Sequence, residues 1–267
     1  MNNKFKIVSF LSILLSIPLI IVSYYGVFAP STYSRETTSL AAQGIGQDIV
    51  NLFIVTPLLL VSLYLYNNGK KIAYLIFSGT ISYILYSFVI YSLGIHFNNL
   101  FLLYCAVLGL SIYIFILSLT DLSKTGFIRI DKNAIPHRII GLFLIIVATL
   151  FYLIWLEEII PAIIGNTVPK SVSDYNVLVN VVHVIDISFA LPGIIISAIL
   201  LLKKKYLGYV LTTVSLVFIL LMAVALIGMV IMMKINGIAD DISVAIIFAI
   251  ISLLSFGMLI RIIRNIN

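Results

Sequence analysis

The sequence predicts an all-α integral membrane protein with eight transmembrane helices. Hydrophobic residues make up 62% of the 267 positions and charged residues only 10%, whereas soluble domains have roughly 45–50% apolar and about 25% charged residues. The mean hydropathy is +1.22. Eight apolar stretches each reach the length of about 20 residues that a spanning helix needs. The lipid bilayer is therefore the first partner that we expect.

The predicted spans follow one another with short connections, which leaves little chain for a domain outside the membrane. In chain order they are 6–28, 47–66, 72–93, 98–120, 138–163, 178–202, 207–233 and 242–261. Lys4 and Lys6 precede the first apolar run, as they would in a signal peptide. We interpret this run as the first helix, because it is long enough to span and no clear small-x-small cleavage site follows it.

The basic residues predict the orientation. Of the sixteen Lys and Arg residues, all but Arg35, Lys170 and Lys234 fall on one side of the predicted membrane, which leaves thirteen there. Basic residues of short loops collect on the cytoplasmic side. Eight helices also return both termini to one side, so the two signals agree. We expect a multi-pass protein of the cell membrane with cytoplasmic N- and C-termini. Because the net charge of +6 comes from these loops, we expect no nucleic acid partner.

The longest predicted cytoplasmic loop divides the chain into two four-helix halves. The first half is 1–122, the basic linker is 123–137, and the second half is 138–267. A shift of 135 positions aligns several residues of the two halves, among them Pro57 with Pro192, Ser62 with Ser197, Lys70 with Lys205, Tyr74 with Tyr209, Asp48 with His183 and Asn51 with Asp186. Halves with an even number of helices would form a parallel repeat. The alternative is that two apolar hairpins with basic turns align this well by chance.

The sixth predicted span carries the sharpest functional signal. Asn180, His183 and Asp186 lie on or beside one helix face, and Pro192 follows them. Asp186 lies roughly 13 Å below the outer end of the span, and an ionised Asp at a helix centre costs about 2.5–3.5 kcal/mol. We expect it to face the protein interior or a wet cavity, with His183 as its nearest partner. The alternative is a buried pair that only holds helices together, at about 0.6 kcal/mol per hydrogen bond.

Two further spans carry acidic residues toward the same outer side. Asp48 and Asn51 lie in the polar first part of the second span, where Asp48 either caps the helix N-terminus or faces a cavity lined by the sixth span. Glu157 and Glu158 end the fifth span and point about 100° apart. One can face the interior and the other the headgroups; the alternative is that both are solvated interface acids. Trp155 is expected in the interfacial aromatic belt.

The motifs of several enzyme classes are absent, and no cofactor is predicted. The chain has no P-loop, no H-E-x-x-H, no G-x-S-x-G and no C-x-x-C-H motif. Its single cysteine, Cys105, cannot form an internal disulfide. His183, Asp186 and Glu158 are the candidate ligands for a divalent metal, although no helix shows a strong ligand spacing.

Three stretches resemble a family of prokaryotic multi-pass membrane proteins. They are Trp155 to Pro161, Asn180-Val-Val-His-Val-Ile-Asp-Ile-Ser-Phe-Ala-Leu-Pro192, and Leu207-Gly-Tyr209. The resemblance runs through most of the second half and is weaker in spans two to four. The family has no assigned activity, so the resemblance implies a polytopic membrane protein and no reaction.

Three functions are consistent with these patterns. The first is a transporter-like protein for protons, cations or a small solute, with an outward-facing cavity. There Asp186 would bind or relay the cation, and His183 would tune the pKa of Asp186. The second is a membrane-embedded, metal-dependent enzyme that acts on a lipid-type substrate through an activated water. The third is a non-catalytic assembly or sensory protein, in which the polar groups only hold helices together.

Overall fold

A computed structural model describes residues 3–132, 134–239 and 241–266 of the chain. Eight of its helices are long and apolar enough to cross a membrane. Within the described residues, the only β-type pairing is a single bridge between Ile130 and Ile266. The all-α class and the multi-pass character predicted from hydropathy are therefore confirmed.

The spans agree with the predicted ranges except at the start of the second. The spans are Lys6–Phe28, Thr38–Asn67, Lys71–Leu93, Phe101–Leu122, His137–Ile164, Val181–Leu202, Tyr206–Ile235 and Ser243–Ile263. The second begins at Thr38 rather than at residue 47, because Thr37 caps it and accepts a hydrogen bond from the Leu40 amide at 3.4 Å. Three more turns of polar and small residues thus join the helix.

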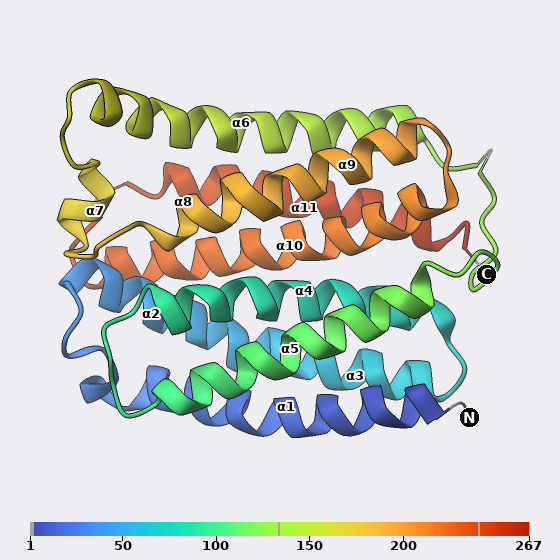
Figure 1. Ribbon diagram of the computed structural model, residues 1–267, viewed down its shortest axis with the longest axis horizontal. Coiled ribbons are helices and arrows are strands. Elements are labelled where there is room, and N and C mark those ends of the chain that lie inside the picture. The colour runs from blue at the N-terminus through green and yellow to red at the C-terminus, as the bar shows by residue number, and fades with distance from the viewer. Residues whose placement is uncertain (1–2, 133, 240, 267) are drawn as a thin grey trace.

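The helical elements can be followed in Figure 1. They are α1 (Asn3–Phe28), η1 (Pro30–Tyr33), α2 (Thr38–Val50), η2 (Asn51–Val55), α3 (Thr56–Asn67), α4 (Lys71–Leu93), α5 (Phe101–Leu122), α6 (His137–Ile164), α7 (Lys170–Asp174), α8 (Val181–Ile185), η3 (Asp186–Ala190), α9 (Leu191–Leu202), α10 (Tyr206–Ile235) and α11 (Ser243–Ile263). The second span is α2, η2 and α3 in succession, and the sixth is α8, η3 and α9.

The helices lie side by side, with both chain termini at one end of the bundle (Figure 1). The α3–α4, α5–α6 and α9–α10 connections lie at this end, and they contain Lys70, Arg129 and Lys204. Helix α7 and the α1–α2, α4–α5 and α10–α11 connections lie at the other end. The basic connections therefore share one end of the molecule with the termini.

Helices α4 and α10 form the centre of the bundle. Helix α4 packs against α3, α5, α8 and α10, and helix α10 packs against α2, α4, α9 and α11. The helices before and after the α5–α6 connection thus meet mainly through α10, and also where α4 contacts α8. Helix α11 packs on α10 and exposes large apolar side chains such as Leu253, as expected for a lipid-facing helix.

Two spans each contain one π-helical turn, η2 and η3, directly before a proline-containing helix. In η2 the Thr56 amide bonds to the Asn51 carbonyl, and the Thr56 hydroxyl bonds to the same oxygen at 2.8 Å. The equivalent backbone bond of η3 ends on the Asp186 carbonyl. Pro57 and Pro192 have no amide hydrogen, and their rings crowd the preceding turn, which the wider π turn relieves. Such turns are frequent at functional sites.

Gly46 of α2 and Gly228 of α10 mark a close approach between a helix before the α5–α6 connection and one after it. A Cβ on Gly46 would lie 2.5 Å from the Gly228 carbonyl oxygen. Small residues at such crossings allow helix backbones in membranes to pack closely. This crossing fixes how α2 lies on α10.

We expect Gly46→Ala to lower the melting temperature of the protein in detergent, because the α2 and α10 backbones would have to separate. Overpacking of this kind costs about 1–3 kcal/mol. Gly109→Ala is the matched control, since nothing lies within 4 Å of a Cβ there. Equal melting temperatures for Gly46→Ala, Gly109→Ala and the unchanged protein would contradict this packing.

Candidate functional site

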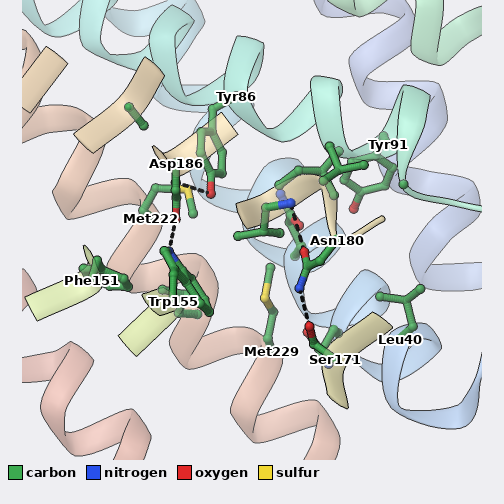
Figure 2. A pocket seen from close by; sticks show the side chains of 18 of the residues that line it. Leu40, Tyr86, Tyr91, Phe151, Trp155, Ser171, Asn180, Asp186, Met222 and Met229 are labelled. Atoms are coloured by element: carbon green, nitrogen blue, oxygen red, sulfur yellow. Dashed lines mark hydrogen bonds between the residues drawn. The ribbon is translucent and has the colours of Figure 1, made fainter. Parts of the chain in front are cut away.

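A partly enclosed cavity of about 430 Å³ lies between the helices before the α5–α6 connection and those after it. Its lining elements meet toward the end of the bundle opposite the termini. It is lined by residues of η1, α2, α4, α6, α8, η3, α9, α10 and α11, and by the connections that precede α2, follow α4 and join α6 to α8. Its volume falls within the range of about 300–1,000 Å³ of small-molecule sites. Figure 2 shows the side chains that converge on it.

The walls of the cavity are mainly apolar and aromatic. Phe151, Met222 and Met229 project into it in Figure 2, and other wall residues are Ile90, Val147, Phe218, Leu226, Phe248 and Ile251. Methionine and aromatic side chains provide an adaptable apolar surface. The polar groups are few, as in most small-molecule sites.

Asp186, the acid predicted inside the sixth span, lines this cavity and accepts two hydrogen bonds. Its Oδ1 accepts a hydrogen bond from the Tyr86 hydroxyl at 2.9 Å, and its Oδ2 accepts one from the Trp155 indole Nε1 at 2.8 Å (Figure 2). Only 7% of its surface is exposed, and it lines the cavity. The carboxylate thus faces the inside of the bundle, held from α4 and α6.

The expected contact between His183 and Asp186 is not formed, and this part of the sequence interpretation was wrong. No hydrogen bond or ion pair among the described residues joins the two side chains. The indole of Trp155 takes the place of the imidazole: it bonds to Asp186, and its ring lies 4.7 Å from the His183 ring, centroid to centroid. His183 is buried but does not line the cavity.

His183 instead belongs to a polar cluster that fastens the α6–α8 connection. Its Nε2 lies 3.6 Å from Glu158 Oε2 and 3.3 Å from Asn180 Nδ2. Glu158 Oε1 accepts the Ser171 amide at 2.6 Å, and Asn180 Nδ2 donates to the Ser171 hydroxyl at 3.0 Å. Asn180 also caps α8 through the Val182 amide. The cluster ties α6, α7 and α8 together beside the cavity.

The two glutamates at the end of α6 point in different directions. Glu158 is partly buried and lines the cavity. Glu157 is exposed and borders a shallow surface pocket with Lys170 and Asp174. The angle of about 100° between successive helical residues accounts for the difference. Glu157 is therefore not part of the cavity.

Asp48 and Asn51 do not line the cavity either, and both interpretations of Asp48 need correction. It lies three turns inside α2, whose first turn contains no acid, so it is no helix cap. Its Oδ2 accepts the Tyr33 hydroxyl and its Oδ1 the Tyr91 hydroxyl at 3.0 Å, while Tyr83 donates to Asn51 Oδ1 at 3.0 Å. Tyr33 and Tyr91 line the cavity in front of Asp48.

Tyr33 lies in the η1 turn outside the spans, where its ionisation bears on this arrangement. Burial, with Asp48 nearby, raises the pKa of Tyr33 well above its usual value. The phenol therefore stays protonated and keeps donating to the carboxylate. Asp48 is thus satisfied behind the wall of the cavity and has no exposed surface.

The candidate metal ligands fall into separate hydrogen-bonded groups. Asp186 bonds to Tyr86 and Trp155, whereas His183 and Glu158 lie in the cluster beside Ser171. Among the described residues, no three His, Cys, Asp or Glu side chains form a group that could hold a metal ion. The donor set that remains around Asp186, a phenol and an indole N–H, consists of groups that donate hydrogen bonds and do not suit a divalent metal.

The residues that hold Asp186 were not predicted. Trp155 was interpreted as an interfacial anchor, and Tyr86 was not singled out. A signal was present in the third span, where Tyr83, Tyr86 and Tyr91 lie on one side of the helix. Phenols inside an apolar span usually have a hydrogen-bond partner. Here the partners are Asn51 for Tyr83, Asp186 for Tyr86 and Asp48 for Tyr91.

Comparison with known protein families, with curated proteins and with solved structures gives no match for this chain. The geometry of the site is therefore the guide to its function.

We expect Glu158→Ala to loosen the connection between α6 and α8, because the Ser171 amide loses its acceptor and His183 its acidic neighbour. Faster proteolysis within residues 165–180 and a loss of about 1–3 kcal/mol of stability should follow. Glu157→Ala is the matched control, since Glu157 is exposed on the adjacent position. If both variants were cleaved at the rate of the unchanged protein, the cluster would have no role in fastening the connection.

Proposed function

We propose that the protein is a transporter-like membrane protein that takes a cation into the cavity and binds it at Asp186. The supporting observation is that the Asp186 carboxylate borders the cavity and, among the described residues, receives side-chain hydrogen bonds from two neutral groups only, Tyr86 and Trp155. Neutral donors satisfy the oxygens without cancelling the charge. Acidic groups inside membrane spans commonly mark ion or substrate pathways.

The charges around the cavity support a cation over an anion. Glu36, Glu158 and Asp186 line it, and none of its described lining residues is Lys, Arg or His. Glu36 already pairs with His96, whose Nδ1 lies 2.9 Å from Glu36 Oε2. Glu158 accepts the Ser171 amide. Asp186 is the acid among them that has no Lys, Arg or His side chain in ion-pair distance in the described part of the chain.

The cavity opens toward the outer side of the cell membrane in this proposal. The basic connections and the termini share the opposite end of the bundle (Figure 1), and positive-inside bias assigns that end to the cytoplasm. A cation would therefore reach Asp186 from outside, past Glu36 and Glu158.

We also propose that the two halves are a parallel repeat. The turn η2 begins at Asn51 and the turn η3 at Asp186. The helices that follow them are α3 (Thr56–Asn67) and α9 (Leu191–Leu202). Both ends of η2 and of α3 lie 135 positions before the corresponding ends of η3 and α9. Equal positions of a rare π turn support duplication over chance. Rocking of one half against the other, around the contacts of α10 with α2 and α4, would then alternate access to Asp186.

Protons would compete with the cation, because Asp186 attracts a cation only when it is ionised. A proton released from the carboxylate as the cation binds, and taken up again as the cation leaves, gives exchange of one for the other. Wild-type transport should therefore weaken as the pH falls and more of the carboxyl is protonated.

Transport can be measured with purified protein in liposomes that enclose a pH-sensitive dye. Gradients of Na⁺, tetramethylammonium or octyltrimethylammonium are applied one at a time, at concentrations that leave protein-free liposomes sealed. We expect at least one cation to drive a proton flux that Asp186→Asn reduces to the protein-free level and that Glu157→Gln leaves unchanged. Flux in Asp186→Asn with the wild-type rate and pH profile, or no flux with any cation, would refute the proposal.

A further inference from the structure

The surroundings of Asp186 suit the head group of an organic cation. A carboxylate offers about four lone-pair sites, of which Tyr86 and Trp155 use two. Four aromatic residues line the cavity near this carboxylate: Tyr86 packs edge-on against Phe218 with ring centroids 5.3 Å apart, and Trp155 contacts Phe151. The faces of such rings attract ammonium-type cations. Carboxylate and rings together match a cation that carries little bound water.

The rest of the cavity suits an apolar group. Beyond Asp186 the walls continue with Phe151, Met222 and Met229 (Figure 2). A hydrated inorganic ion would lose its water against these side chains without receiving replacement ligands. An alkyl or aryl group loses nothing there and gains contact with the walls. The cavity thus has apolar walls next to Asp186, and its other acids, Glu36 and Glu158, lie on different elements of the lining.

The acids of the lining favour a ligand with a positive charge at Asp186. Asp186 is the lining acid without a basic side chain in ion-pair distance among the described residues, whereas His96 lies beside Glu36 and His183 beside Glu158. A ligand carboxylate or phosphate would meet no basic group in the described lining. Zwitterions and anions are therefore disfavoured by the missing counter-charge.

On the basis of the function proposed above, we propose that the cavity binds amphipathic organic monocations, with the cationic head at Asp186 and the apolar part between α6, α10 and α11. The ligand class is a monovalent ammonium-type or other lipophilic cation. Inorganic cations, polar zwitterions and anionic amphiphiles are the classes that the site rejects.

The chain carries its own reporter for this site. Trp155 is the only tryptophan, and its indole N–H bonds directly to Asp186. A cation that arrives at the carboxylate must change the surroundings of this indole. Tryptophan fluorescence of the purified full-length protein in lipid nanodiscs therefore measures occupancy of the site without any added label.

The probes are octyltrimethylammonium, octyl sulfate and tetramethylammonium. The first two share a tail and differ in the sign of the head, so membrane partitioning alone would affect both. We expect octyltrimethylammonium to change Trp155 fluorescence saturably, octyl sulfate to give no saturable change, and tetramethylammonium to require at least about tenfold higher concentration. Equal responses to octyl sulfate and octyltrimethylammonium would overturn the proposal.

Two variants test the assigned contact. Asp186→Asn should weaken octyltrimethylammonium binding by about tenfold or more, and Glu157→Gln should bind as the unchanged protein does. The probe series on the unchanged protein decides the matter if Asp186→Asn fails to fold. Undiminished binding by a folded Asp186→Asn would overturn the proposal.

The outcome also separates this proposal from the transport function. If Na⁺ or tetramethylammonium drove Asp186-dependent flux while octyltrimethylammonium did not bind, the transport function would stand and the ligand class would be wrong. If octyltrimethylammonium bound through Asp186 without any flux, the ligand class would stand and transport would be wrong.

Discussion

A carboxylate placed among membrane-spanning helices must find hydrogen-bond donors inside the protein, and this requirement organises the polar part of the bundle. Asp186 is satisfied by Tyr86 and Trp155, and Asp48 by Tyr33 and Tyr91. Both acids use two neutral donors, which come from other elements and therefore tie distant parts of the chain together. Because the donors are neutral, the carboxylates keep the capacity to carry charge.

Asp48 and Asp186 lie in different surroundings, although each accepts hydrogen bonds from two neutral donors. Asp48 has no exposed surface, and a Cβ on Gly26 of α1 would overlap its carboxylate, so that side of the bundle is closed. Asp186 borders the cavity between α4, α6 and α10. If the halves are a repeat, the polar turn of the first half, at Asp48 and Asn51, is closed off from the cavity, whereas that of the second half, at Asp186, borders it. Of these two aspartates, Asp186 alone borders the cavity.

Hydropathy and charge predicted the class and the spans, because lipid imposes a length and an apolar composition that can be read locally. The same reasoning placed Asp186 inside the bundle, since burial follows from the cost of exposing an acid to lipid. This reasoning did not identify the hydrogen-bond partners of Asp186. His183 was near in sequence, but Trp155 and Tyr86 reach Asp186 from other helices, and no local pattern encodes such contacts. The π turns were also missed; only Pro57 and Pro192 marked them.

Position 186 borders the cavity, while Phe189 of the same span is exposed on the outer surface of the bundle. Cysteine labelling tests this directly in a Cys105→Ser background, with Asp186→Cys compared with Phe189→Cys, whose side chain is 60% exposed on the outer surface of the bundle. A charged, water-soluble maleimide should label position 186 in native membranes and leave position 189 unlabelled. Labelling at 189 with none at 186 would contradict the account.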